Sequence, residues 1–284
     1  MVENNPLKRY FRRPAMYMRL PTQGKWYTDN DVQLTQEKEI AVYGLTALDE
    51  IMLNTPDAML NGKALEQVVL NCAPDIKNIK DFLLPDLESL FVAIKVATDD
   101  GKHSFDRNCP KCNHENNFEL NCQYILDTMT FIEESDTTVS FNDDLVVHVK
   151  PYSLEMRQLF LQREFEEQRT LKDIDDANQN INEFEKARII SEGVGRLSKM
   201  TFDLVSKSIV KIQIVKDRTE VTDSEYINEW LLGITKTQSD AVIKAVNALN
   251  DVGIKKTIPA TCTSCGHEWN ENISFDPVSF FARR

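Results

Sequence analysis

The chain has 284 residues, 42% of them hydrophobic, and a formal net charge of −12 at pH 7. This composition is ample for a packed core, and no apolar run approaches the roughly 20 residues of a membrane-spanning helix. Residues 1–27 hold six Lys/Arg and one Glu, so the rest of the chain carries 27 positive and 44 negative side chains. An acidic body repels phosphates over most of its surface, which argues against nucleic acid as the partner.

Residues 1–28 are predicted to form an extended basic arm. Prolines at positions 6, 14 and 21 prevent any helix longer than two turns, and cations alternate with aromatic side chains. A flexible solvated tail is the alternative. We favour an arm that becomes ordered on a partner, because aromatic and methionine side chains are costly to leave in water. The candidate partner-binding residues of the arm are Arg9, Tyr10, Phe11, Arg12 and Arg13.

Residues 29–102 are predicted to combine strands and helices. The expected elements are two extended segments within 32–43, the second ending at 39–43, and helices that begin after Thr46, begin at Pro56, span 63–71 and span 86–97. The last of these is the clearest, because Pro85 precedes it and its apolar side chains recur at helical spacing.

Two C-x-x-C knuckles lie far apart, at residues 109–112 and 262–265, each between short segments predicted as strands. Two thiolates at this spacing on a hairpin turn can bind one ion, and two such turns supply the four ligands of a tetrahedral structural zinc ribbon. The predicted zinc ligands are Cys109, Cys112, Cys262 and Cys265. Four thiolates leave no open coordination position, so the expected metal is structural rather than catalytic.

Three alternatives compete with zinc at the knuckles. Iron in a rubredoxin-like four-cysteine cage has nearly the same signature and is the less favoured metal. Disulfides are disfavoured, because nothing resembles a secretory signal peptide and a reducing compartment is therefore expected. A redox enzyme would need a helix N-terminus beside one cysteine pair, and the strand context suggests none.

The rest of the chain is divided into three predicted regions. Residues 103–150 hold the first half of the ribbon and a β-hairpin, residues 151–250 are mainly helical, and residues 251–284 hold the second half and a C-terminal tail. The helical region has predicted N-caps at Ser153 and Asp223, a helix from about Asp173, a helix over 239–249, and a stretch over 201–215 that opens like a helix and ends like a strand.

The chain ends in two adjacent phenylalanines, Phe280 and Phe281. Exposing both would be costly, so we expect them to dock on the protein's own core or on an interface. The predicted fold class is α+β. It contains a discontinuous four-cysteine zinc ribbon built from two distant hairpins, with helical segments before and between them.

No catalytic motif is found. The sequence has no H-E-x-x-H, no G-x-S-x-G and no G-x-x-x-x-G-K-[ST], and its nine glycines leave few places for a phosphate-binding loop. The four histidines include three beside the knuckles. We therefore predict a scaffold or assembly protein and not an enzyme.

Several short motifs together carry a resemblance. In order they are a P-T-Q-G-K-W-Y turn, an N-G-K-A-L helical block, a C-P-x-C knuckle, a helical middle, a C-x-x-C-G knuckle and a terminal F-F. This arrangement is similar to the T4-type bacteriophage baseplate hub proteins, which are structural or assembly components of contractile tails. Only the four cysteines carry over as a site.

The resemblance implies a role in building the baseplate near the hub. The implied partners are other hub and tail proteins, and the implied location is the virion tail baseplate after assembly in the host cytoplasm. The alternative is a cytosolic zinc-ribbon adaptor that binds nucleic acid through its basic arm.

Overall fold

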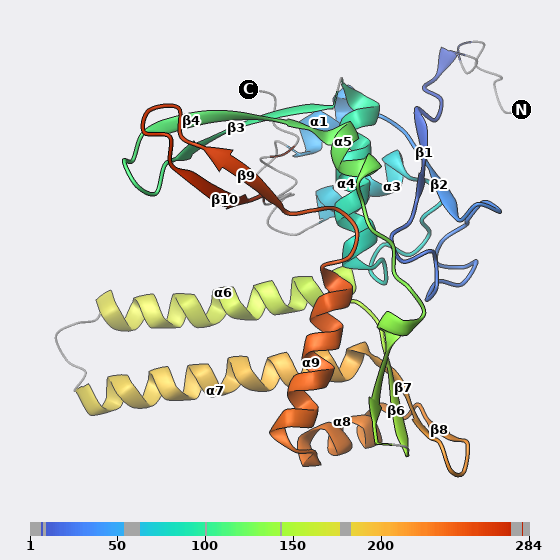
Figure 1. Ribbon diagram of the computed structural model, residues 1–284, viewed down its shortest axis with the longest axis vertical. Coiled ribbons are helices and arrows are strands. Elements are labelled where there is room, and N and C mark those ends of the chain that lie inside the picture. The colour runs from blue at the N-terminus through green and yellow to red at the C-terminus, as the bar shows by residue number, and fades with distance from the viewer. Residues whose placement is uncertain are drawn as a thin grey trace, which may run out of the picture. The chain divides into compact units, whose positions relative to one another are not determined.

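The computed structural model describes residue 7 and residues 10–53, 63–99, 101–142, 144–176, 183–273 and 280. The chain forms two compact units, whose helices and strands are labelled in Figure 1. Unit 1 is Met1–Phe131 with Asp251–Arg284, and unit 2 is Ile132–Asn250. Unit 2 is therefore an insertion in the sequence of unit 1. Among the helices that the structure describes, none has both the length and the apolar character needed to cross a membrane.

Unit 1 is built around one buried helix. Its elements are β1 (Met16–Arg19), β2 (Glu39–Val42), α1 (Ala47–Leu53), α3 (Lys63–Cys72), α4 (Leu84–Thr98), β3 (Lys102–Asn108), β4 (Glu115–Asn121), α5 (Cys122–Asp127), β9 (Thr257–Thr261) and β10 (Glu268–Asn272). The strands form three separate antiparallel pairs, β1–β2, β3–β4 and β9–β10. α4 contacts β1, β2 and α5 and is buried on nearly every side, which explains why apolar residues predominate in its sequence.

A buried carboxylate fastens the P-T-Q-G-K-W-Y turn to the first turn of α4. Asp86 accepts hydrogen bonds from the Thr22 backbone N–H (2.9 Å), the Thr22 hydroxyl (2.6 Å) and the Tyr27 hydroxyl (2.6 Å). The Tyr27 hydroxyl in turn accepts from the backbone N–H of Leu83, just before the helix (2.8 Å). Burial raises the pKa of Asp86 to about 6, although these hydrogen bonds act to lower it.

Unit 2 combines a sheet with four helices among the residues that the structure describes. Its elements are η2 (Ser135–Thr137), β5 (Thr138–Phe141), β6 (Leu145–Val149), α6 (Leu154–Asp176), α7 (Glu183–Ser208), β7 (Ile209–Ile214), β8 (Thr219–Val221), α8 (Ser224–Gly233) and α9 (Lys236–Asn250). The sheet is antiparallel in the order β5-β6-β7-β8, and α9 packs on β5 and β6. Its core-facing strand side chains include Val147 and Ile212, which are paired and buried.

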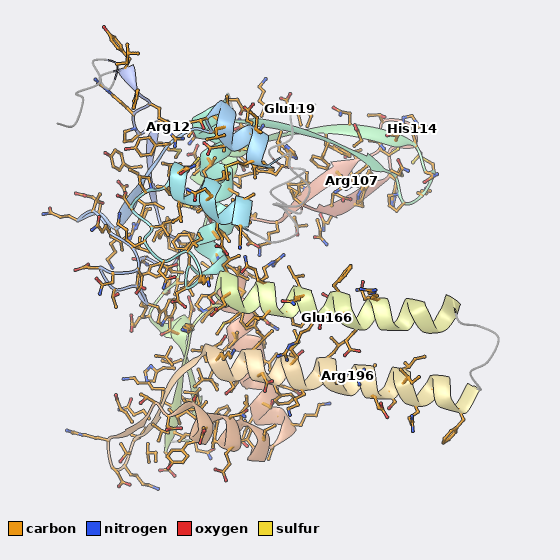
Figure 2. The ribbon with its side chains drawn as sticks, turned by 180° about the vertical axis from the view of Figure 1, so that it is seen from behind. Arg12, Arg107, His114, Glu119, Glu166 and Arg196 are labelled. Atoms are coloured by element: carbon orange, nitrogen blue, oxygen red, sulfur yellow. The ribbon has the colours of Figure 1, made fainter. Side chains whose placement is uncertain are left out.

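α6 and α7 lie side by side as long helices (Figures 1 and 2). Arg196 of α7 donates two hydrogen bonds to the Glu167 carboxylate of α6, at 2.5 and 2.9 Å. Met156 and Met200 are buried, whereas Phe165 is 67% exposed. The pair is therefore held by a narrow apolar seam and an ion pair.

Most predicted elements are confirmed, and the fold class is α+β. The predicted N-caps Thr46, Ser153 and Asp223 all accept hydrogen bonds from the first turns of their helices. The ambiguous stretch 201–215 holds both elements, because α7 ends at Ser208 and β7 begins at once.

Four expectations about the elements differ from the structure. The predicted arm over residues 1–28 is too long, since Met16–Arg19 is strand β1, which pairs with β2, and Met18 is buried. The helix start near Asp173 is wrong, since α6 continues through Asp176. The hairpin β5–β6, grouped with the first knuckle by sequence, lies in unit 2 because β6 pairs with β7. The short helix α5 was not predicted. The helix expected at Pro56 lies outside the residues that the structure describes.

Candidate metal centre

The two knuckles meet. Residues 109–112 form the turn between β3 and β4, and residues 262–265 form the turn between β9 and β10. The sulfurs of Cys109 and Cys265 lie 3.8 Å apart, and those of Cys112 and Cys262 lie 3.6 Å apart. All four Sγ atoms lie within 4.8 Å of one another, and none is in a disulfide.

These separations fit a tetrahedral metal site. Four sulfurs at about 2.3 Å from a Zn²⁺ ion lie about 3.8 Å from one another. A disulfide would bring two sulfurs to about 2.05 Å, well below the observed separations. The cluster thus has the number, kind and spacing of ligands that structural zinc requires.

The two knuckles have the same backbone conformation. Asn113 donates a backbone hydrogen bond to the carbonyl of Cys109 (2.9 Å). Gly266 donates the equivalent bond to the carbonyl of Cys262 (3.0 Å). Both donors have positive φ, +57° and +65°, which Gly and Asn adopt at the lowest cost. The glycine of the C-x-x-C-G motif is explained by this turn.

The thiols of the cluster differ in acidity. Desolvation opposes ionisation of Cys262, but the backbone N–H groups of Cys265 and Ser264 lower its pKa to about 6. The backbone N–H of His114 favours ionisation of Cys112, yet the neighbouring thiols and burial raise its pKa to about 12. In this crowded cluster one thiolate therefore forms first, and a bound dication would favour ionisation of the others.

Asn116 of β4 connects the two knuckles, and sequence reasoning missed it. Its side chain is 2% exposed and donates to the His114 carbonyl (2.8 Å) and to the Cys262 sulfur (3.8 Å). Its oxygen accepts from the backbone N–H of Thr263 (2.9 Å) and from the Thr263 hydroxyl (3.0 Å). A lone asparagine in a strand carries no periodic signal that would have identified it.

A second group of contacts joins the two hairpins away from the sulfurs. Arg107 of β3, which Figure 2 labels, donates to the Glu271 carboxylate of β10 at 2.9 Å. The Trp269 indole donates to the other oxygen of that carboxylate, also at 2.9 Å. The rings of Phe118 and Trp269 meet edge to face at 5.9 Å. The two hairpins thus contact each other along their strands as well as at the cysteines.

The other two cysteines, Cys72 and Cys122, are both fully buried away from the cluster. Desolvation raises the pKa of Cys72 to about 11 and that of Cys122 to about 12. Both behave as small core residues with protonated thiols.

The arm residues fall into three groups. Tyr10 and Phe11 are 69% and 59% exposed, and Arg13 is also exposed. Arg12 is bound by the body, because its guanidinium donates to the carbonyls of Gly44 and Asn71 and lies 3.7 Å from the buried Asp49 carboxylate. Arg9 lies outside the described residues.

The terminal aromatic pair is only half described. Phe280 is 0% exposed and its ring lies 4.7 Å from that of His103. This agrees with the expectation that it docks on the core. Phe281 lies outside the described part of the chain.

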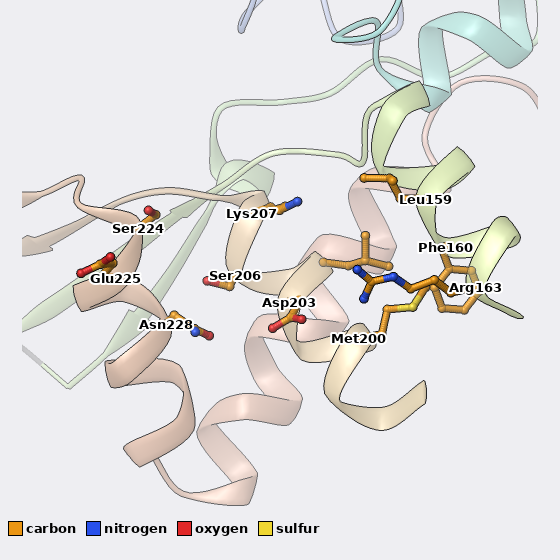
Figure 3. Close-up of a pocket in the computed structure, with 11 residues that line it drawn as sticks. Leu159, Phe160, Arg163, Met200, Asp203, Ser206, Lys207, Ser224, Glu225 and Asn228 are labelled. Carbon is orange, nitrogen blue, oxygen red and sulfur yellow. The ribbon is translucent and has the colours of Figure 1, made fainter. Parts of the chain in front are cut away.

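Unit 2 contains a separate pocket of about 290 Å³ between α6, α7 and α8 (Figure 3). Its wall mixes apolar side chains with charges of both signs: Leu159, Phe160, Arg163, Met200, Asp203, Leu204, Ser206, Lys207, Ser224, Glu225 and Asn228. The lining includes the carboxylates of Asp203 and Glu225, the amine of Lys207 and two serine hydroxyls, but neither His nor Cys. We assign no chemistry to it.

The fold and the cysteine cluster together define an α+β protein with a split four-cysteine ribbon. The family described as T4 bacteriophage base plate protein matches residues 30–282, nearly the whole chain. The chain belongs to this family and is a structural component of a phage baseplate. No curated protein and no solved structure matches it significantly.

Proposed function

We propose that the protein is a hub-region component of the tail baseplate that holds one structural Zn²⁺ between its two knuckles. The observation that carries the metal assignment is the set of four free sulfurs within 4.8 Å of one another. Cys109, Cys112, Cys262 and Cys265 are the ligands. A bound zinc ion supplies a cross-link between two segments of unit 1 that are 150 residues apart in sequence.

The metal proposal is tested by elemental analysis of the purified full chain. One zinc per chain, lost equally in Cys109→Ser and Cys262→Ser, is the expected result. Cys122→Ser is the matched control, because its thiol is buried outside the cluster, and it should retain the metal. If Cys262→Ser kept full zinc while Cys109→Ser lost it, the knuckles would not share an ion. Iron in place of zinc would make the site rubredoxin-like.

The hub assignment rests on family membership and on surfaces suited to protein partners. Membership in a baseplate family supports contacts with other tail proteins and a non-catalytic role. The arm offers the exposed rings of Tyr10 and Phe11 beside the exposed Arg13, a combination enriched in binding hot spots. Arg12 anchors the base of the arm, and Arg9 and Phe281 complete the proposed partner-binding set. Assembly takes place in the host cytoplasm and ends in the virion tail.

Deletion of the arm before Arg12 tests this assignment. The fold and the melting temperature should be unchanged, while incorporation into hub and tail intermediates should fall. The protein tagged at its C-terminus and located by negative-stain microscopy on tail intermediates should appear at the hub. Normal incorporation of the deletion variant would overturn the docking role of the arm, and label elsewhere on the baseplate would overturn the hub position.

The nucleic-acid adaptor is distinguished by a separate measurement. A basic arm on an acidic body would give an electrophoretic shift of DNA or RNA that weakens steeply with salt. We expect no shift at physiological salt, because residues after position 27 carry 17 more negative than positive side chains.

A further inference from the structure

Asn116 is the one polar side chain buried in β4, where both of its sequence neighbours are exposed. A primary amide has two N–H donors and two acceptor lone pairs on its oxygen. All four are used: one N–H meets the His114 carbonyl, one meets the Cys262 sulfur, and the oxygen receives two hydrogen bonds from Thr263. Three of these four bonds reach the opposite knuckle, about 147 residues away in sequence.

The orientation of the amide is determined by its partners. The backbone N–H of Thr263 can only donate, so the group facing it at 2.9 Å must be the amide oxygen. The amide nitrogen therefore faces the His114 carbonyl and the Cys262 sulfur. An N–H directed at a sulfur stabilises the ionised form that binds a metal.

We propose that Asn116 is the positioning residue of the metal centre. It holds the second knuckle in register with the first and donates a hydrogen bond to the sulfur of Cys262 when that sulfur is a metal-bound thiolate. This inference rests on the proposed zinc site. Groups that support metal ligands in this way often change metal affinity by 10- to 100-fold when they are removed.

The test compares Asn116→Asp and Asn116→Ala with the wild-type full chain. Aspartate keeps an oxygen for Thr263 but cannot donate to Cys262, whereas alanine removes both functions. We expect both variants to bind zinc about 10- to 100-fold more weakly in competition with a chelating dye. In the cobalt(II)-substituted protein the sulfur-to-cobalt charge-transfer band should move to longer wavelength, because the sulfur loses a hydrogen-bond donor.

Asn117→Ala is the matched control. This neighbouring asparagine is exposed and donates to Asp106 on the adjacent strand (2.7 Å), so its removal should leave zinc affinity and the cobalt spectrum unchanged. Both Asn116 variants with wild-type affinity and an unmoved cobalt band would overturn the proposal, even if they melted at a lower temperature. In that case Cys262→Ser would still abolish binding, so the zinc site itself would stand. A wild-type chain without stoichiometric metal would overturn both.

Discussion

The ribbon of unit 1 consists of two hairpins, and the α6–α7 pair of unit 2 consists of two long helices. Different interactions hold the two hairpins together and the two helices together. The strands of the ribbon are mostly exposed, with only Phe105, Asn116, Leu120 and Ala260 buried. They rely on specific groups: four sulfurs, a buried amide and the contacts around Glu271. The helices make their backbone hydrogen bonds internally, so a narrow apolar seam and one ion pair are enough to hold α6 and α7 together.

A segment with little buried core depends on a few irreplaceable contacts. Loss of a single ligand should unfold the ribbon, whereas loss of one surface contact should scarcely affect the helices. Unit 2 also has its own sheet and core, so damage to the ribbon should leave it folded.

The largest effect is expected from Cys262→Ser. Zinc binding in ribbon-like sites contributes on the order of 10 kcal/mol, comparable to the stability of a whole domain. The variant should lose its metal, and the segment after position 250 should become sensitive to protease while the helices of unit 2 stay protected. Limited proteolysis with mass spectrometry measures this. Cys72→Ser, which removes a buried thiol outside the cluster, is the control. Simultaneous loss of both units would contradict independent folding.

Phe280→Ala should give the next largest effect. Its ring is fully buried against His103, and truncation of a buried phenylalanine costs about 3–5 kcal/mol. Urea unfolding monitored on unit 1 measures the loss. Phe184→Ala on α7 is the matched control, because that ring is 84% exposed, and it should change stability by less than about 0.5 kcal/mol. Equal effects in the two variants would show that Phe280 is not docked.

Asp86→Asn should change the pH dependence of unit 1. The pKa of Asp86 is raised from 3.8 to about 6, so the folded state binds the proton more tightly than the unfolded state. This contribution to stability is present below pH 3.8 and is lost as the pH rises through 6. It amounts to about 3 kcal/mol, the equivalent of about two pKa units. The wild type therefore loses this contribution as the pH rises from 4 to 7, whereas the variant has none to lose. The difference in stability should shift in favour of the variant over this range.

The comparison is made by urea unfolding at a series of pH values from about 3 to 7. Asp31→Asn is a control of opposite sign, because hydrogen bonds from Thr28 lower the pKa of Asp31. That variant should lose stability relative to wild type as the pH rises from about 3 to 5. An Asp86→Asn variant that tracks the wild type at every pH would show that the buried carboxylate does not titrate in this range.

The smallest effect on stability is expected from removal of the Glu167–Arg196 ion pair. Its hydrogen bonds lower the pKa of the Glu167 carboxyl, but the Arg196 side chain is 53% exposed and water screens the interaction. Arg196→Ala should shift the melting temperature of unit 2 only slightly, and the difference should vanish in 1 M salt. A large shift that persists in high salt would mean that the pair, and not the seam, holds the helices together.

The local elements and the ribbon ligands could be predicted because their signals are local. Helix α4 has Pro85 in its first turn and apolar side chains at helical spacing, and the cysteine pairs are recognisable from spacing alone. The register of β6 on β7 could not be predicted, because it joins residues 60 to 69 positions apart. The hydrogen bond from Tyr27 to Asp86 could not be predicted from the sequence for the same reason, since these residues are 59 positions apart.

The roles of single polar residues were also beyond the sequence. Asn116 is one of many asparagines in the chain, and only the meeting of the knuckles distinguishes it. Arg12 was grouped with partner-binding residues because it lies in a basic run, yet its guanidinium reaches carbonyls that come from two distant segments. Such contacts are determined by tertiary packing and not by local pattern.

The insertion of unit 2 between the knuckles has a consequence for synthesis on the ribosome. Cys112 emerges 150 residues before Cys262, which at ~5–20 residues per second is a wait of roughly 8–30 s. During that interval the first two thiols have no partners, while unit 2 is completed behind them. A chain whose synthesis stops before position 262 lacks the second pair of thiols, so its ribbon cannot close around a metal.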